Sequence, residues 1–250
     1  MLTNETKDYG LSDTNGWWCR ILADDFDNDG DTDLVIGNLG TNTQFKASPT
    51  EPLTITYGDF FGNGVVQPVL CYYNKSISYP YYSKDEMADQ FPLMQKKFLH
   101  YSDYADARLN DIFSKDQLEK SHTVEIKTLR SVYLRNDGNK KFTISTLPTY
   151  AQLSAINGMA SSDIDKDGYK DIIIVGNFYP LRVGIGPIDA GMGLVLKGNG
   201  KGNFTPMPYA ETGLNVRGDT RDLVSVKTGN KILFVAAKND GPLQIVQLMQ

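Results

Sequence analysis

The chain has 250 residues, of which 40% are hydrophobic and 22% charged, and its mean hydropathy is −0.34. This composition excludes disorder over the whole length, and no apolar run approaches the roughly 18 residues that a membrane-spanning helix needs. The formal net charge is −5 and lysine and arginine form no cluster, which argues against nucleic acid as a partner.

The negative charge is concentrated in two short segments. Six aspartates fall within residues 24–33, and four fall within residues 163–171. Removing these ten charges would change the formal net charge from −5 to +5. The acidic residues therefore indicate two local sites rather than a generally acidic surface.

A β-hairpin around the first acidic segment is the first predicted element. ILADDF (21–26) leads into the acidic loop and DLVIGN (33–38) leaves it, both with the apolar pattern of short strands. The segment DFDNDGDTDLVIGN recurs as DIDKDGYKDIIIVGN at 163–177, and a degraded copy, DFFGNGVVQPVLCYY, begins at Asp59. This repetition predicts a repeat architecture.

A small helical insertion is predicted at residues 83–122. SKDE (83–86) and SKDQ (114–117) fit capping boxes, in which a serine begins a helix and the Glu or Gln three residues later returns a hydrogen bond. Pro92 suits the first turn of another helix. We expect the insertion to pack locally on a sheet, and docking of a partner is the alternative.

Further strands are predicted from a second repeated motif. An alternating apolar run, a Gly-rich turn and a Phe occur in VYLRNDGNKKFTI (132–144) and in LVLKGNGKGNFTP (194–206). A fourth unit, NVRGDTRDLVSV (215–226) followed by KILFVAAKND, keeps the strand pattern without an acidic loop. The predicted fold class is all-β: residues 1–250 form a single region of a partial β-propeller, with about four four-stranded blades and the helical insertion within it.

Both strong loops have the pattern of a calcium site. Carboxylates stand at positions 1, 3, 5 and 9 and Gly at position 6, so alternate side chains of a tight turn converge on one point. This many oxygen ligands favour Ca²⁺ over Zn²⁺, which prefers His or Cys, and over Mg²⁺, which keeps several waters. An EF-hand is excluded, because strands flank the loops and position 12 is not Glu. The candidate ligands are Asp25, Asp27, Asp29, Asp33 and the carbonyl of Asp31 in the first loop, and Asp163, Asp165, Asp167, Asp171 and the carbonyl of Tyr169 in the second.

The degraded copy has fewer charged ligands. Phe61, Asn63 and Gln67 stand where the strong loops have carboxylates. We expect a turn there, with a third calcium site at Asp59 and Asn63 as the alternative. The two strong sites are interpreted as structural, because the sequence places no evident nucleophile or paired base around them.

These segments resemble the FG-GAP/VCBS repeats of integrin-α-type β-propellers, whose pattern is D-x-D-x-D-G-x-x-D between two strands, then a strand and N-x-G-x-x-x-F. Residues 10–248 are more closely similar to the C-terminal part of large bacterial VCBS-repeat proteins of the ASPIC/UnbV type. GWWCRILADDFDNDGDTDLVIGNLG, GLNVRGDTRDLVSV and the insertion after YYNKSISYP carry the similarity. The sequence departs from the pattern at Phe61 and Gln67, and at the shortened loop 219–222.

The resemblance implies calcium-stabilised repeats on secreted, periplasmic or surface-attached proteins with adhesive or recognition roles. It also leads us to expect the remaining blades, and a signal peptide, in a longer parent chain. The primary hypothesis is a non-enzymatic module that binds a protein or a glycan. The alternatives are a propeller-scaffold polysaccharide lyase or hydrolase, and a structural stretch of a larger envelope protein.

Three smaller features have competing interpretations. Arg217-Gly218-Asp219 spells a cell-attachment tripeptide, but a turn with a structural Arg/Asp pair is the preferred interpretation. Cys19 and Cys71 are interpreted as buried free thiols, with a single bridge between them as the alternative. A catalytic role for His100 or His122 is not favoured, because a triad is recognised by geometry that a sequence does not supply.

Overall fold

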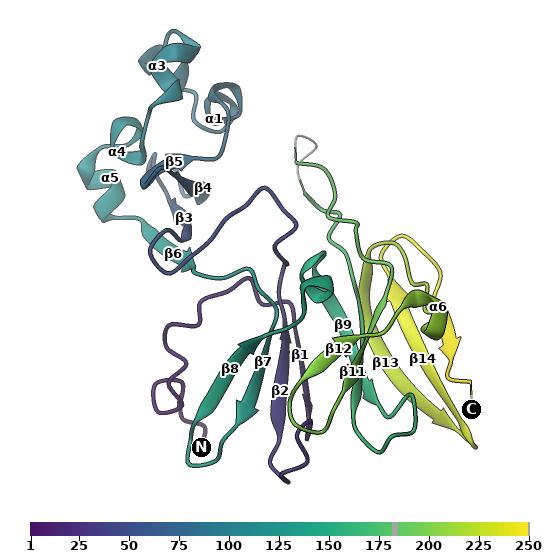
Figure 1. The fold of residues 1–250 in the computed structure, drawn as a ribbon. Helices are drawn as coiled ribbons and strands as arrows, with labels where there is room; N and C mark the ends of the chain where they lie inside the picture. The colour runs from purple at the N-terminus through teal and green to yellow at the C-terminus, as the bar shows by residue number, and fades with distance from the viewer. Residues whose placement is uncertain (182–184, 250) are drawn as a thin grey trace. The chain divides into compact units, whose positions relative to one another are not determined.

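In a computed structural model, which describes residues 1–181 and 185–249, the chain is mostly β and contains four antiparallel sheets (Figure 1). The chain divides into two units: unit 1 comprises 1–13, 17–44 and 129–250, and unit 2 comprises 14–16 and 45–128. Unit 2 is thus almost entirely an insertion into the sequence of unit 1.

The first sheet of unit 1 has the order β1-β2-β7-β8. Its strands are β1 (Arg20–Asp24), β2 (Asp33–Gly37), β7 (Val132–Asn136) and β8 (Phe142–Thr146). The register pairs Leu34 with Leu134. The third strand of this sheet therefore comes about 100 residues after the second in the sequence, and residues 45–128 of unit 2 lie between them in the chain. The strands predicted at VYLRN and at the following Phe segment are both present, and the structure shows that they complete the sheet of the first acidic hairpin.

The second sheet repeats this plan without an inserted unit. Its order is β12-β11-β10-β9, with β9 (Ile156–Ser162), β10 (Asp171–Gly176), β11 (Leu194–Gly198) and β12 (Phe204–Pro206). The third sheet contains three described strands, β13 (Thr220–Thr228), β14 (Lys231–Lys238) and β15 (Gln244–Gln247), where four were expected. Two short helical turns, η1 (Thr149–Gln152) and α6 (Tyr209–Thr212), connect elements of unit 1.

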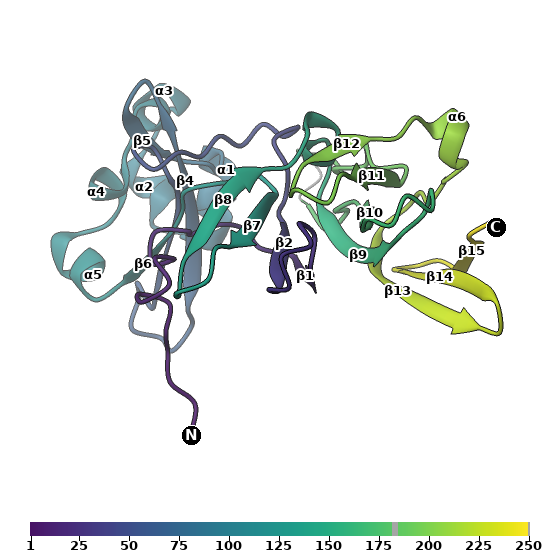
Figure 2. The same ribbon diagram turned by 60° about the horizontal axis from the view of Figure 1, so that its bottom comes forward.

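The second sheet is covered on both faces, which explains the continuous apolar run of β10. Every residue of β10 is buried. Ile172 and Ile174 belong to the same hydrophobic cluster as Val35 of β2, whereas Ile173 and Val175 cluster with residues of the third sheet. Alternate side chains of a strand point to opposite faces, so one apolar run packs against two neighbouring sheets. Correspondingly, β9 lies beside both β1 and β13 (Figure 2).

Unit 2 contains the fourth sheet, of order β5-β4-β3-β6. Its strands are β3 (Leu53–Gly58), β4 (Gln67–Asn74), β5 (Ile77–Pro80) and β6 (His122–Ile126). Between β5 and β6 come five short helices: α1 (Lys84–Gln90), α2 (Met94–Lys97), α3 (Tyr101–Ala105), α4 (Leu109–Ile112) and α5 (Lys115–Glu119). The predicted helical segment is confirmed.

The helices of unit 2 pack their apolar side chains on β4. Met87 and Phe91 are buried in one cluster with Val69 and Cys71 of β4. The capping boxes expected at the starts of α1 and α5 are both present, because Ser83 and Ser114 each accept a hydrogen bond from the backbone N–H three residues later. None of the described helices is long and apolar enough to cross a membrane. A closed ring of sheets is not seen among the described residues.

Candidate metal centres in two acidic hairpin loops

The two strong acidic loops connect equivalent strands of the first two sheets. The first loop (25–33) joins β1 to β2, and the second (163–171) joins β9 to β10. In each loop, positions 4 and 6 adopt the left-handed backbone conformation. These residues are Asn28 (φ 61°) and Gly30 (φ 95°), and Lys166 (φ 63°) and Gly168 (φ 90°). Gly at position 6 is therefore required by the turn itself.

Two hydrogen bonds recur at the same positions of both loops. The N–H of position 6 donates to the carboxylate of position 1, and the N–H of position 7 donates to that of position 5. The pairs are Gly30–Asp25 (3.1 Å), Gly168–Asp163 (3.0 Å), Asp31–Asp29 (2.8 Å) and Tyr169–Asp167 (3.0 Å). The position-7 residues Asp31 and Tyr169, whose carbonyls were the expected ligands, are both exposed. The two loops thus share one local structure.

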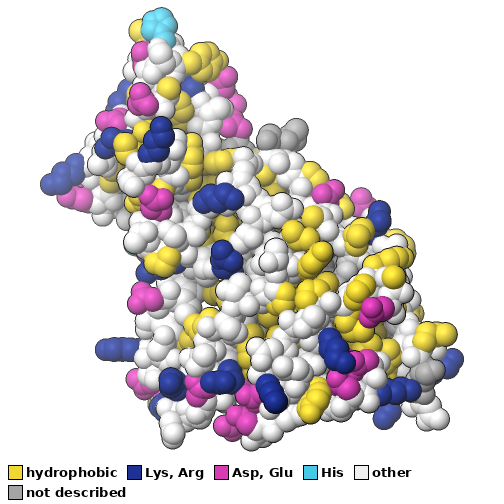
Figure 3. Space-filling model, in the orientation of Figure 1, with side chains coloured by type: hydrophobic (Ala, Val, Ile, Leu, Met, Phe, Trp, Pro, Cys, Tyr) yellow, Lys and Arg dark blue, Asp and Glu magenta, His cyan; other side chains and the backbone are white. Residues whose placement is uncertain are grey.

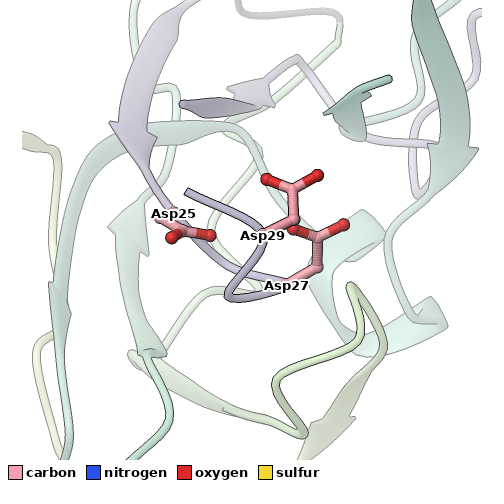
Figure 4. Close-up of side chains that lie close together, drawn as sticks. All are labelled: Asp25, Asp27 and Asp29. Carbon is pink, nitrogen blue, oxygen red and sulfur yellow. The ribbon is translucent and has the colours of Figure 1, made fainter. Parts of the chain in front are cut away.

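The first loop gathers three carboxylates. Asp25, Asp27 and Asp29 each offer one oxygen, and these oxygens all lie within 4.8 Å of one another. Figure 4 shows the three side chains on the turn, with Asp27 and Asp29 next to each other and Asp25 on the other limb. Oδ1 of Asp25 and Oδ1 of Asp27 are buried and accept no hydrogen bond from the residues that the structure describes. Burial, and after it the charge of Asp33, raises the pKa of Asp27. A bound cation would therefore stabilise the ionised form of the Asp27 carboxylate.

The second loop gathers a different set. Oxygens of Asp163, Asp165 and Asp171 lie within 4.8 Å of one another. Oδ1 of Asp163 is buried and has no hydrogen-bond partner in the described part of the chain. Asp165 and Asp167 both form ion pairs with Lys197 of β11, the latter at 2.9 Å. This lysine, which lies outside the loop, holds the pKa of Asp167 below its usual range.

The aspartate at position 9 links each loop to the third strand of its sheet. Oδ1 of Asp33 accepts from the N–H of Asn136 (2.8 Å), and Oδ1 of Asp171 accepts from the N–H of Gly198 (2.9 Å). Both carboxylates are fully buried, and burial raises the pKa of Asp171. Their other oxygens accept the N–H of position 2 at 3.2 and 2.8 Å. Position 9 therefore has a structural role that the ligand pattern alone does not indicate.

These oxygen sets fit a hard divalent cation. Calcium lies 2.3–2.6 Å from its oxygen ligands, so oxygens on opposite sides of it are about 5 Å apart. Mutual separations within 4.8 Å are compatible with that limit. The buried oxygens without donors supply lone pairs that an ion would use. Acidic and basic side chains both lie along the lower edge of unit 1, where the β1–β2 and β7–β8 turns lie (Figure 3).

The degraded loop in unit 2 keeps the turn and loses the ligands. Gly62 (φ 67°) and Gly64 (φ 80°) repeat the two left-handed positions. The N–H of Gly64 donates to Asp59 at 2.7 Å, as at position 6 of the strong loops. Gln67, at position 9, has a buried side-chain oxygen with no hydrogen-bond partner among the described residues. The loop is therefore a turn, as expected, and the structure groups no set of three carboxylates there within its described part.

The other candidate residues have structural contacts. Asp219 is 3% exposed and pairs with Arg221 at 2.6 Å, so the Arg217-Gly218-Asp219 tripeptide does not present its carboxylate to solvent. The expected Arg/Asp pair exists, with Arg221 rather than Arg217 as the cation. His100 is the N-cap of α3, and the ring of His122 lies 5.7 Å from that of Tyr57.

Lys197 and Tyr133 contribute to the loops and were missed by the sequence reasoning. Tyr133 donates its hydroxyl to Asp33 at 2.7 Å. A signal for Lys197 existed, because aligning VYLRN with LVLKG places a basic residue at the same position after each loop. No protein-family model matches the sequence, and no curated protein matches it. The site is therefore defined by its geometry alone: two oxygen-rich hairpin loops in equivalent places of two packed antiparallel sheets.

Proposed function

We propose that this chain is a calcium-stabilised module of the FG-GAP/VCBS β-propeller kind, which recognises a protein or a glycan outside the cell. The observation that carries the proposal is the convergence of Asp25, Asp27 and Asp29, two of which have a buried oxygen without a donor. The second loop supports it, because the same turn recurs with its own three-carboxylate set.

The sheet arrangement supports the propeller part of the proposal. The first two sheets have the same strand order and the same loop position, and the innermost strands of a propeller's blades lie side by side as β1, β9 and β13 do. Unit 2 then represents a degenerate repeat carried within the first blade. The extracellular recognition role is supported by the resemblance of the loop motifs and by the millimolar calcium available outside cells.

Calcium has a structural role in this proposal. Each loop connects the two strands of a hairpin, and these are the first two strands of their sheet. Three converging carboxylates repel one another, and the attraction of a bound divalent cation for each of them outweighs that repulsion. Binding to the folded chain alone stabilises it by RT ln(1 + [L]/Kd), which is about 2.7 kcal/mol at a hundredfold excess over Kd.

The test is thermal unfolding with calcium and with chelator. We expect a melting temperature several degrees higher in 10 mM CaCl₂ than in EGTA, and no such difference in the double variant Asp27→Ala/Asp165→Ala. Asp89→Ala, which removes an exposed carboxylate on α1, is the matched control and should keep the full calcium response. A double variant that melts like the parent at saturating calcium would overturn the structural role.

The recognition role needs a separate measurement. Binding of the full chain to arrayed glycans and to extracellular matrix proteins, with calcium and with EGTA, should give calcium-dependent retention on one ligand class. Turnover of a polysaccharide in the same assay would instead assign the chain to the enzymes. Retention that is equal in EGTA would show that the ligand surface does not depend on the loops.

A further inference from the structure

The first two sheets each place one basic residue at the same position beside the acidic loop. Arg135 and Lys197 come directly after Leu134 and Leu196, the last residues of β7 and β11 that pair with the second strand of their sheet. The next residue in each chain segment donates its N–H to the position-9 aspartate. The two cations are therefore equivalent in the fold.

Their ion pairs differ. Lys197 pairs with Asp165 and Asp167, at positions 3 and 5 of the second loop. Arg135 pairs through Nε with Oδ1 of Asp137 at 2.7 Å, and Asp137 is a residue of the β7–β8 turn. The ammonium of Lys197 thus neutralises part of the oxygen cluster, whereas the paired carboxylate of Arg135 lies outside the first loop.

One substitution between the repeats accounts for this difference. Asp137 stands two residues after Arg135, and the equivalent residue two positions after Lys197 is Asn199. The side-chain oxygen of Asn199 accepts the N–H groups of Lys201 and Asn203 at 3.0 and 3.1 Å, so it closes the turn and brings no negative charge. Lys197 has no carboxylate in that turn, and its described ion pairs are with the loop.

We propose that Lys197 is an internal counter-ion that competes with a divalent cation for the second loop, so that the first loop binds calcium more tightly. The inference rests on the proposed function, because it assumes that both loops bind the ion. A bound cation would have to share Asp165 with the ammonium or displace it. Repulsion by one unit charge a few ångströms away, screened by the solvent at this exposed position, corresponds to roughly a tenfold loss of affinity.

The same arrangement gives the loops different behaviour without calcium. The second loop keeps part of its charge balanced by Lys197, while in the first loop Oδ1 of Asp25 and Oδ1 of Asp27 are buried without a donor, and the described ion pair of Arg135 is with Asp137 outside the loop. We therefore expect the first loop to be the more dependent on the ion for its order. The two sites would then fill in sequence, the first at lower calcium.

The test is calcium titration by isothermal calorimetry on full-length chains with one loop disabled. Asp163→Ala leaves the first loop intact and Asp27→Ala leaves the second, and the first should bind about tenfold more tightly. In the Asp27→Ala background, Lys197→Met should tighten binding about tenfold, and Asn199→Asp should tighten it by supplying the carboxylate that the first sheet has. In the Asp163→Ala background, Asp137→Asn should weaken binding.

The outcomes separate this inference from the proposed function. A gain of affinity in Lys197→Met cannot come from misfolding, and circular dichroism melts of each variant identify any chain that has lost its fold. The counter-ion role would be overturned if both loops bind calcium with equal affinity and if Lys197→Met and Asn199→Asp leave that affinity unchanged. This result would still support the two calcium sites. No heat of binding at either loop would overturn the calcium sites and the inference together.

Discussion

The hydroxyl of Tyr133 donates a 2.7 Å hydrogen bond to Oδ2 of Asp33, which lies 100 residues earlier in the sequence. Unit 2 separates the two residues along the chain, yet they meet inside the first sheet of unit 1. Asp33 is fully buried and also accepts the N–H groups of Phe26 and Asn136. One carboxylate therefore joins the end of the first acidic loop to the strand that follows the insertion.

Removing the Tyr133 hydroxyl should weaken this junction. Tyr133→Phe takes one of three donors from a buried carboxylate, and we expect the free energy of unfolding to fall by about 1–2 kcal/mol. Burial and the bond to Asp33 also raise the pKa of Tyr133, so the hydroxyl stays protonated and keeps donating at alkaline pH. Urea denaturation in saturating calcium measures the change. Tyr150→Phe, at a side chain 65% exposed, is the control, and equal midpoints for the two variants would contradict the prediction.

Close packing of the first two sheets depends on Gly37 at the end of β2. A Cβ built there would lie 2.5 Å from the backbone oxygen of Ile156, where β9 begins. Backbone cannot rotate away as a side chain can, so Gly37→Ala should cost at least about 1–3 kcal/mol of stability. At Gly241 a Cβ would meet the nearest atom at 3.4 Å, and Gly241→Ala is the matched control. Similar urea midpoints for both variants would show that the sheets separate more easily than the packing implies.

Both cysteines should be slow to react in the folded protein. They are free thiols, and burial raises the pKa of Cys19 to about 11 and that of Cys71 to about 12. The thiolate is the reactive species, so at pH 8 both groups are protonated and unreactive. We expect little reaction with Ellman's reagent in native buffer and two thiols per chain in guanidinium without reductant. Recovering no thiols after unfolding would instead indicate a Cys19–Cys71 bridge.

The capping box of α1 should slow amide hydrogen exchange in the first turn of that helix. In the folded chain Glu86 accepts hydrogen bonds from the N–H and the hydroxyl of Ser83, and Ser83 Oγ accepts the N–H of Glu86. Ser83→Ala removes the cap at a cost of about 1 kcal/mol, which corresponds to roughly fivefold faster amide exchange over α1. Ser83→Thr keeps a hydroxyl and should exchange like the parent in hydrogen-exchange mass spectrometry. Equal exchange in Ser83→Ala would show that packing of Met87 holds the turn without its cap.

Features that depend on neighbouring residues could be predicted. The hairpin loops follow from Gly at position 6 and from aspartates at alternate positions, because a tight turn brings side chains two residues apart to one side. The helix starts at Ser83 and Ser114 follow from a four-residue pattern for the same reason. The degraded loop is predicted as a turn without a metal because few of its carboxylates remain, and the structure adds that Gly62 and Gly64 adopt the left-handed conformation of that turn.

Pairing between distant segments could not be predicted in the same way. The pattern of VYLRN predicts a strand, but period-two alternation does not say which strand it pairs with. Closing a chain segment of this length costs only slightly more entropy than closing a short one, so a unit can be inserted between β2 and β7 without being signalled locally. Asp219 illustrates the same limit, because its burial follows from its surroundings in the fold and not from the tripeptide that contains it.

The amino-acid order by itself determined the turns, the segments that form strands, the helix caps and the two groups of aspartates, because each of these follows from a pattern within a short stretch of the sequence. Only the tertiary structure decided that the third strand crosses an inserted unit and that Asp33 and Asp171 tie their loops to it. It also decided that Lys197 forms ion pairs with the second loop, whereas Arg135 forms one with Asp137. The physical reason is that an ion pair or a buried hydrogen bond depends on distance in space, which a local pattern does not encode.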